Sequence, residues 1–403
     1  MKEAMEIDVV ELTQRLVQIP SVNPMGHAVE GEIYLEHRVT DFLQSWFEQQ
    51  GLAFERTTVD AGRDNIVAIL PGVAAGTPDE RILVLEAHQD TVPIDGMVVE
   101  PFCGQIEGGR LYGRGAVDIK GGMATMLACV AELKREPSPN LPTIVLACTV
   151  NEECGFTGAT ALARQWRDSQ SKLVTRIPDA MIVSEPTSFQ VVVAHKGVVR
   201  WKCHTGGVAA HSSRPMEGDN AIYRMADVLQ AIRGYDTELF SAHAGQDLLE
   251  MPTISVGTIE GGVSVNTVAD HCVIEIDRRL TPGQSPHEAR EALIQYIASH
   301  VGDVSRITHE PAYMYSPGLV ETPENQRLAR HIIQCAARLG ITSDTDRVPY
   351  GTNCPPYHEI GIPTVVFGPG DIAQAHTKDE FVEVEALRQG TAALVEVCRN
   401  YHD

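Results

Sequence analysis

Short runs of apolar, mostly β-branched residues alternate along the chain with longer segments whose apolar residues recur at helical spacing. The strand-like runs lie at residues 81–87, 143–149, 180–184 and 363–368, and each is apolar on both faces. Central strands of a parallel sheet that is covered on both sides have this character. Helices are predicted between these runs, for example at residues 121–135 and 159–167. The alternation predicts an α/β fold with a mostly parallel central sheet.

The segment from residue 190 to residue 311 has a different pattern. Strand-like and helical stretches follow one another here in the order strand, strand, helix, strand, strand, helix, strand, with helices predicted at residues 220–233 and 285–300. This order predicts a compact α+β domain of ferredoxin-like type, after which the α/β pattern resumes. We therefore expect the main domain to comprise residues 1–189 and 312–403, with residues 190–311 inserted into it.

Composition narrows the possible functions. The chain has 403 residues, of which 43% are hydrophobic, and a net charge of −22. Such an acidic surface repels phosphate backbones, so we expect no nucleic-acid partner. No apolar run is long enough to span a membrane, and acidic residues interrupt the apolar stretches of the first 20 residues, so we expect neither a membrane partner nor a signal peptide. The nine scattered cysteines favour a reducing cytoplasm.

Histidine and carboxylate residues follow the predicted strands. These residues are His88 and Asp90, Glu152 and Glu153, Glu185, and His376, and Asp118 stands just before the helix predicted at 121–135. In an open α/β sheet, ligands bind in the crevice beyond the carboxyl ends of the strands. We therefore expect one crevice to gather these two histidines and five carboxylates.

Each of these residues taken alone has an ordinary explanation, as a turn residue, a helix cap or a solvated first turn. Together, five carboxylates without a cation would repel and raise one another's pKa, whereas a divalent metal removes that repulsion. Histidine with carboxylate suits zinc with open coordination positions. The H-E-x-x-H and G-x-S-x-G motifs are absent, and Asp118 stands where a dinucleotide-binding loop after Gly113 would need a glycine.

Seven motifs run in order over nearly the whole chain: HQDTVP (88–93), LYGRGAVDIKGG (111–122), NEECGFTGA (151–159), SEPT (184–187), AHSSRP (210–215), DRR (277–279) and GPGDIAQAHTKDEFV (368–382). They resemble the family of acetylornithine deacetylase, succinyl-diaminopimelate desuccinylase and carboxypeptidase G, and are most similar to its deacetylase branch. The resemblance implies a zinc hydrolase that removes the acyl group from an N-acyl amino acid. A desuccinylase, a carboxypeptidase or a dipeptidase of the same family is the alternative. In a catalytically inactive metal-binding or assembly protein we would expect a metal ligand or the general base to be missing from these motifs, and none is missing.

The resemblance also implies a role for each residue of the crevice. His88 and Glu185 would hold one zinc ion, Glu153 and His376 the second, and Asp118 would bridge both. Cobalt or manganese could replace zinc. Asp90 would orient His88 from behind, and Glu152 would act as general base and then general acid on a water shared by the two ions.

The inserted segment corresponds in this family to a lid that also forms a homodimer. His211 would then reach the site of the partner subunit and polarise the scissile carbonyl group, while Asn266 and Arg278 would touch the substrate. A further substrate contact is expected at Gly351, Thr352 and Asn353. The deacetylases tend to carry an acidic residue after the Gly-Thr pair, where this chain has Asn353, so a cationic substrate such as one derived from ornithine could lose a partner here.

Overall fold

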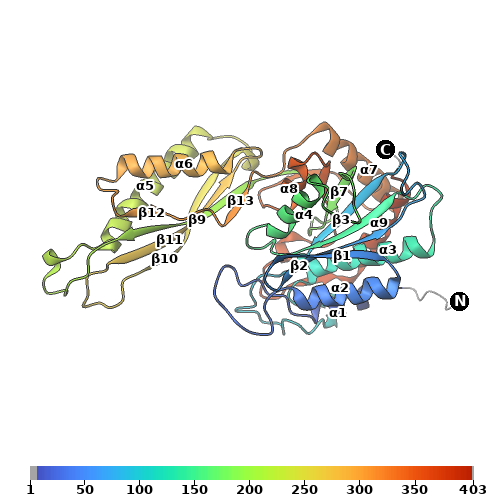
Figure 1. Cartoon of the computed structure of the whole chain (residues 1–403), viewed down its shortest axis with the longest axis horizontal. Coiled ribbons are helices and arrows are strands. Elements are labelled where there is room, and N and C mark those ends of the chain that lie inside the picture. The colour runs from blue at the N-terminus through green and yellow to red at the C-terminus, as the bar shows by residue number, and fades with distance from the viewer. Residues whose placement is uncertain (1–6, 402–403) are drawn as a thin grey trace. The chain divides into compact units, whose positions relative to one another are not determined.

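The computed structural model describes residues 7–401 and consists of two compact units (Figure 1). The first unit comprises Met1–Val193, Glu321–Arg347 and Thr352–Asp403, and the second comprises Ala194–Val320 and Val348–Gly351. One unit therefore interrupts the other, and a short return at residues 348–351 joins the second unit again. The insert was expected at residues 190–311, whereas the main stretch of the second unit begins at Ala194 and extends to Val320. No signal peptide was expected in the first 20 residues. Residues 1–6 of that stretch lie outside the described residues.

The first unit is built on a large sheet whose middle strands are parallel, as predicted. Its order is β1 (Ala53–Asp60), β2 (Arg63–Leu70), β6 (Thr143–Thr149), β3 (Ile82–His88), β7 (Ala180–Val183), β15 (Thr364–Val366), β8 (Val191–His195) and β14 (Thr345–Val348). β6, β3, β7 and β15 run parallel, and β2 and β8 pair with them antiparallel. The antiparallel hairpin of β1 and β2 was not predicted.

One predicted strand joins a different sheet from the expected one. Residues 191–205 were expected to lie in the insert, but they divide at Lys196 into β8, which belongs to the large sheet, and β9 (Gly197–Gly206). β8 is buried at every residue and belongs to the large sheet, whereas buried and half-buried residues alternate along much of β9, which lies in the second unit. The two burial patterns reflect a strand covered on both faces and a strand covered on one.

Helices cover both faces of the large sheet. They are α1 (Val9–Val17), α2 (His37–Gln50), α3 (Gly121–Arg135), α4 (Thr157–Arg167), α7 (Pro323–Arg338), α8 (Cys354–Glu359) and α9 (Val384–Arg399). One continuous apolar core joins α1, α2, α3, α7 and α9 to alternate strand residues such as Leu83 and Leu85. α4 and α8 lie together on the other side (Figure 1), where the rings of Trp166 and Tyr357 are 5.8 Å apart.

The start of α3 fits closely against the end of β7. A side chain at Gly122 would collide with the hydroxyl group of Ser184, so only glycine allows this approach. The preceding turn, η1 (Ala116–Lys120), contains Asp118 in a non-helical conformation. A small sheet of β4 (Ile106–Glu107), β5 (Arg110–Tyr112) and β16 (Phe381–Glu383) places the segment before η1 beside residues near 380. Asp118 is thereby placed near the carboxyl end of β7.

The second unit is an antiparallel sheet with helices on one face. Its strands β10 (Thr253–Gly261), β11 (His271–Leu280), β9 and β12 (Ile307–His309) are adjacent in that order, and β13 (Met314–Ser316) also pairs with β9. α5 (Ala221–Ala242) and α6 (Pro286–His300) lie over one face (Figure 1) and pack on the inward side chains of β9 and β11. The predicted α+β insert is confirmed, although α5 continues well past its expected end at residue 233.

The short helices η2 (Pro215–Glu217), η3 (Leu248–Glu250) and η4 (Ile372–Gln374) complete the elements. Across residues 7–401, no helix is both long and apolar enough to cross a membrane.

Candidate metal centre

The parallel strands of the large sheet end at one edge, and the candidate ligands lie there. His88 is the last residue of β3 and is paired in register with Thr149, the last residue of β6. Glu152 and Glu153 follow β6 directly, and Glu185 follows β7. Because adjacent parallel strands have their carboxyl ends at the same edge, these side chains converge as the sequence predicted.

Asp118 lies between the two histidines. Its Oδ1 is 3.1 Å from His88 Nε2 and its Oδ2 is 3.2 Å from His376 Nε2. His88 Nε2 is also 4.0 Å from Glu185 Oε1, and His376 Nε2 is 3.4 Å from Glu153 Oε2. His88, Asp118 and Glu185 thus form one group of potential metal ligands, and Asp118, Glu153 and His376 form a second. The two groups share Asp118 through its two different oxygen atoms.

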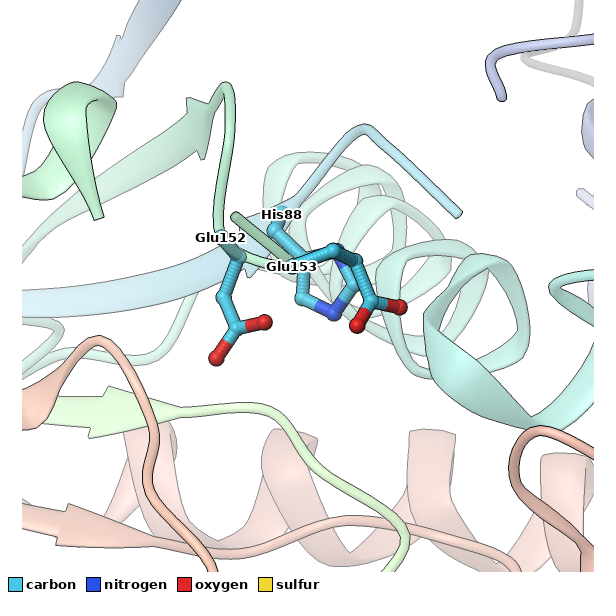
Figure 2. A group of neighbouring side chains, drawn as sticks. All are labelled: His88, Glu152 and Glu153. Carbon is cyan, nitrogen blue, oxygen red and sulfur yellow. The ribbon is translucent and has the colours of Figure 1, made fainter. Parts of the chain in front are cut away.

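Glu152 lies beside the first group. Its carboxylate, His88 and Glu153 also have potential ligand atoms that are all within 4.8 Å of one another. Figure 2 shows the ring of His88 between the side chains of Glu152 and Glu153 in that view. Glu152 and Glu153 are only 8% and 9% exposed, so neither is the solvated first turn of a helix.

The electrostatics of this group require positive charge. Burial, and after it the charges of neighbouring carboxylates, raises the pKa of Glu153, and burial likewise raises the pKa of Glu152 and Glu185. Hydrogen bonds to Asp118 and Glu153 raise the pKa of His376 to about 11. Oε1 of Glu153 is buried and has no hydrogen-bond partner among the described residues. Such a donor set fits divalent metal ions, which supply the positive charge and take the unpartnered oxygen as a ligand.

Asp90 is placed differently from the expectation. Nδ1 of His88 is 2.9 Å from the backbone oxygen of Asp90 and 3.6 Å from its carboxylate Oδ1. The carboxylate instead accepts the backbone N–H groups of Glu152 and Glu153, each at 3.1 Å. The main chain of Asp90 therefore makes the shorter contact with His88, while its side chain lies 3.6 Å from His88 and also positions the two glutamates. Burial opposes charge on Asp90, but interactions with His88 outweigh it and lower the pKa of Asp90 to about 2.

A buried polar network that the sequence did not reveal supports Asp90. Asn23 donates from Nδ2 to the Asp90 carboxylate at 2.7 Å and to Oδ1 of Asn151 at 2.9 Å. Arg63 donates to the same Asn151 oxygen at 2.8 Å and forms a 2.6 Å ion pair with Glu36, which accepts the Asn151 backbone N–H. These residues come from four separate segments, so no local pattern could identify them.

Glu380 was also missed, although it lies in one of the motifs. Its Oε1 accepts the backbone N–H groups of Val117 at 3.1 Å and Asp118 at 3.2 Å. Its Oε2 is 2.5 Å from Nη1 of Arg114, and both side chains are buried. Glu380 thereby holds the turn that presents Asp118 to both histidines.

The predicted lid residues belong to the second unit. His211 and Asn266 are exposed and lie side by side, since His211 forms a β-bridge with Thr267 and the Asn266 carbonyl group accepts the Ser212 N–H at 3.0 Å. Arg278 is fully buried, and its Nη1 donates to the backbone carbonyl groups of its own unit. A substrate contact by Arg278 stays a prediction and would require this side chain to leave those carbonyl groups.

The segment 351–353 does not present the side chains that were expected to contact substrate. Gly351 is the last residue of the return into the second unit, and Thr352 and Asn353 are fully buried. Nδ2 of Asn353 donates to Glu86 Oε1 at 2.9 Å and to Thr149 Oγ1 at 3.1 Å. The Asn353 side chain is therefore part of the interior beneath the sheet edge, and the expectation that it touches the substrate does not fit this placement.

Comparison with known proteins adds a family and a fold. The family described as Peptidase family M20/M25/M40 matches residues 84–400. The structure is similar to aminopeptidase PepT of Bacillus cereus, with 22% identity, 97% of each chain covered and a TM-score of 0.68. It is also similar to the di-peptidase Dug1p of Saccharomyces cerevisiae, with 14% identity, 98% of this chain and 95% of that chain covered and a TM-score of 0.77. A third similar structure is the YXEP protein of Bacillus subtilis, a dinuclear metal binding peptidase, with 17% identity, 97% of this chain and 96% of that chain covered and a TM-score of 0.64.

Proposed function

The chain belongs to peptidase family M20/M25/M40 and is a metal-dependent hydrolase of amide bonds. We propose that its substrate is an N-acyl amino acid. The observation that supports metal-dependent hydrolysis is the pair of ligand groups that share Asp118, with the buried Glu152 beside them. The choice of an N-acyl amino acid rests on the motifs SEPT and AHTKDE, which resemble those of acetylornithine deacetylases.

The two ligand groups divide the metal-binding role. We infer that His88, Asp118 and Glu185 hold one divalent ion and that Asp118, Glu153 and His376 hold the other. Zinc suits this donor set, and cobalt or manganese could replace it. When bound, the ions lower the pKa of the attacking water and polarise the substrate carbonyl group.

The chain's own acid–base group is Glu152. It accepts a proton from the attacking water as the new C–O bond forms, and returns that proton to the amine nitrogen as the C–N bond breaks. Glu152 is buried beside the ligand groups, so a proton taken from the water can be passed on within the site. His211 would donate a hydrogen bond to the oxygen on which negative charge develops.

The placement of Asn353 is compatible with a cationic amino acid on the amine side of the substrate. Because Asn353 bonds to Glu86 inside the fold, its difference from the acidic residue of the deacetylases does not argue against a cationic amino acid such as ornithine. A dipeptide is the second candidate, favoured by the similar structures named aminopeptidase and di-peptidase.

We further propose a homodimer through the second unit. β10 lies at one edge of the antiparallel sheet and most of its residues are exposed. The large exposed apolar side chains of this unit include Met216, Tyr223, Val263 and Val265, with exposed fractions of 94%, 74%, 86% and 100%. A second copy would cover these side chains where they lie together and would also pair the free edge.

Metal analysis and a substrate panel test the proposed function. Protein purified without chelator should contain about two divalent ions per chain, and removing them should abolish a hydrolytic activity that added zinc restores. The panel contains N-acetyl amino acids, N-succinyl amino acids and dipeptides. If the protein cleaves only the dipeptides, the second candidate replaces the proposed substrate. Full activity after removal of the metal ions would contradict the metal assignment.

A further inference from the structure

Two histidines on the second unit face each other across neighbouring strands. His204 lies on β9 and His271 begins β11, and these strands pair antiparallel next to each other. Nδ1 of His204 is 3.1 Å from Nε2 of His271, and the ring centroids are 5.4 Å apart. The strand neighbours of the two histidines are buried, namely Cys203 and Thr205 beside His204 and Cys272 after His271. Because successive side chains of a strand point to opposite faces, both histidines point away from the helix-covered face.

A carboxylate fixes the proton on the outer nitrogen of this pair. Glu310 Oε1 is 2.7 Å from Nε2 of His204 and accepts the proton that this nitrogen carries. In a neutral imidazole only one nitrogen bears a proton, so Nδ1 of His204 presents its lone pair to His271. A proton on Nε2 of His271 completes the hydrogen bond at this distance, and a cation that replaced it would bind beside the line between the two nitrogens.

We propose that this pair is a further divalent-cation site, with His204 Nδ1 and His271 Nε2 as ligands and Glu310 behind His204. Two imidazole nitrogens bound to one zinc at about 2.0–2.1 Å are about 2.9–3.4 Å apart for angles between square and tetrahedral. The 3.1 Å separation falls inside that range, and the rings, whose centroids are 5.4 Å apart, would have to turn so that both lone pairs point to one ion. Imidazole ligands suit Zn²⁺, Ni²⁺ and Cu²⁺, and water would complete the coordination.

The position of Glu310 is what distinguishes this site from a surface hydrogen bond. A histidine that binds a metal usually donates its other ring N–H group to a carboxylate or a carbonyl group, which fixes the ring and makes the ligand more basic. His204 already has this arrangement, and Glu310 is itself held by its backbone N–H group, which donates to the Lys202 carbonyl oxygen on β9 at 3.0 Å. The side chains of His204 and Glu310 are 24% and 51% exposed, so an ion in solution can reach the pair.

The site goes beyond the proposed hydrolysis. It shares no residue with the ligand groups around Asp118, which all belong to the first unit. An ion held here would link β9, β11 and the segment after β12, and a ligand that binds only the folded state stabilises it. We therefore expect the second unit to become more resistant to unfolding in excess zinc.

Equilibrium dialysis of the full-length protein against rising free zinc tests the site. Wild type should bind one more zinc ion per chain than His271→Asn, and Glu310→Gln should retain the site with about 10–100-fold weaker affinity. His300→Asn is the matched control, because His300 is another exposed histidine of the same unit and lies on α6 against Tyr296. It should bind as many ions as wild type.

The difference of one ion between wild type and His271→Asn does not depend on how many ions the catalytic centre holds. Equal zinc binding by wild type and His271→Asn would overturn the proposal and leave a hydrogen-bonded pair. If His271→Asn does not fold, Glu310→Gln decides, since an unchanged affinity in that variant would also overturn it. Excess zinc should raise the unfolding temperature of wild type more than that of either variant, and an equal rise in all three would count against the site.

Discussion

At the scale of single residues, two adjacent glutamates with the same backbone anchor have different surroundings. Glu152 and Glu153 both donate their backbone N–H groups to the Asp90 carboxylate. The Glu153 carboxylate is 3.4 Å from His376 and belongs to a group that contains Asp118, whereas that of Glu152 is grouped with His88 and Glu153 but not with Asp118. The side chains, not the main chain, therefore distinguish the proposed metal ligand from the proposed acid–base group.

The substitutions Glu152→Gln and Glu153→Gln test this division of roles. Glu152→Gln should keep its metals and lose about 10²–10⁴-fold in turnover, because an amide cannot carry the proton. Glu153→Gln should instead bind one metal ion more weakly. Each variant serves as the control for the other, since both keep the hydrogen bonds to Asp90. Metal content and kcat measured on the same samples decide, and the opposite pattern would mean that the two roles are assigned backwards.

Spacing in the sequence predicted which residues meet but not which atoms meet. His88 and Asp90 were placed together correctly, yet the backbone oxygen of Asp90, not its carboxylate, makes the short contact. Asn23 and Glu380 carry no signal of their own, because an amide or a carboxylate in a loop is ordinary until its partner is known. Their positions depend on packing between segments far apart in the sequence, such as the 263-residue separation between Glu380 and Val117.

At the scale of elements, β3 carries a carboxylate within an otherwise apolar run. Glu86 is fully buried, and its Oε1 accepts hydrogen bonds from Thr149 and Asn353. Its Oε2 and the Oδ1 of Asn353 are both buried and have no hydrogen-bond partner among the described residues. A proton on Oε2 could satisfy both atoms at once, and burial raises the pKa of Glu86 to about 7.

Glu86→Gln should therefore stabilise the metal-free protein at alkaline pH. The unfolded carboxyl group ionises near its ordinary pKa of 4.5 and the folded one near 7, so stability falls as pH rises between these values and stays low above them. Glutamine never ionises, and its NH₂ group can donate to Asn353. The gain at pH 8 should be at most about 3 kcal/mol and should shrink towards pH 5.

Thermal unfolding of chelator-treated protein across that pH range measures the effect. Glu86→Ala is the control, because it removes the hydrogen bonds to Thr149 and Asn353 and leaves a cavity. It should lower the unfolding temperature at every pH. An unfolding temperature for Glu86→Gln that lies below wild type by the same amount at pH 5 and pH 8 would contradict this account.

Elements that are buried on both faces were predicted best. β6 and α3 begin and end where the sequence pattern placed them, because a continuous apolar run and a helix of small apolar residues leave few alternatives. The assignment of β8 to the large sheet was missed because the apolar pattern runs on from β8 into β9, with only Lys196 between the strands. Which of two sheets a strand joins is decided by long-range pairing, which a local pattern does not contain.

At the scale of the whole molecule, the candidate chemistry is divided between two units. All residues of both ligand groups lie in the first unit, and His211 and Asn266 lie in the second. His211 is exposed, and its Nδ1 is 2.8 Å from the Ser213 hydroxyl group, so Nε2 is the nitrogen available to donate to a substrate. If the second unit forms the homodimer, this donor can serve the site of the partner chain.

Mixing two nearly inactive variants tests that arrangement. His211→Ala should lower turnover by about 10²–10³-fold without loss of metal, since it removes a donor to the developing negative charge. After subunit exchange with Glu152→Gln, each heterodimer has one site that combines an intact Glu152 with an intact His211 from the other chain. Random exchange makes half of the dimers heterodimers with one such site of two, so activity should recover towards about a quarter of wild type. Unmixed variants carried through the same exchange protocol are the controls. If labelled subunits are shown to exchange and activity still does not recover, His211 does not act across the dimer.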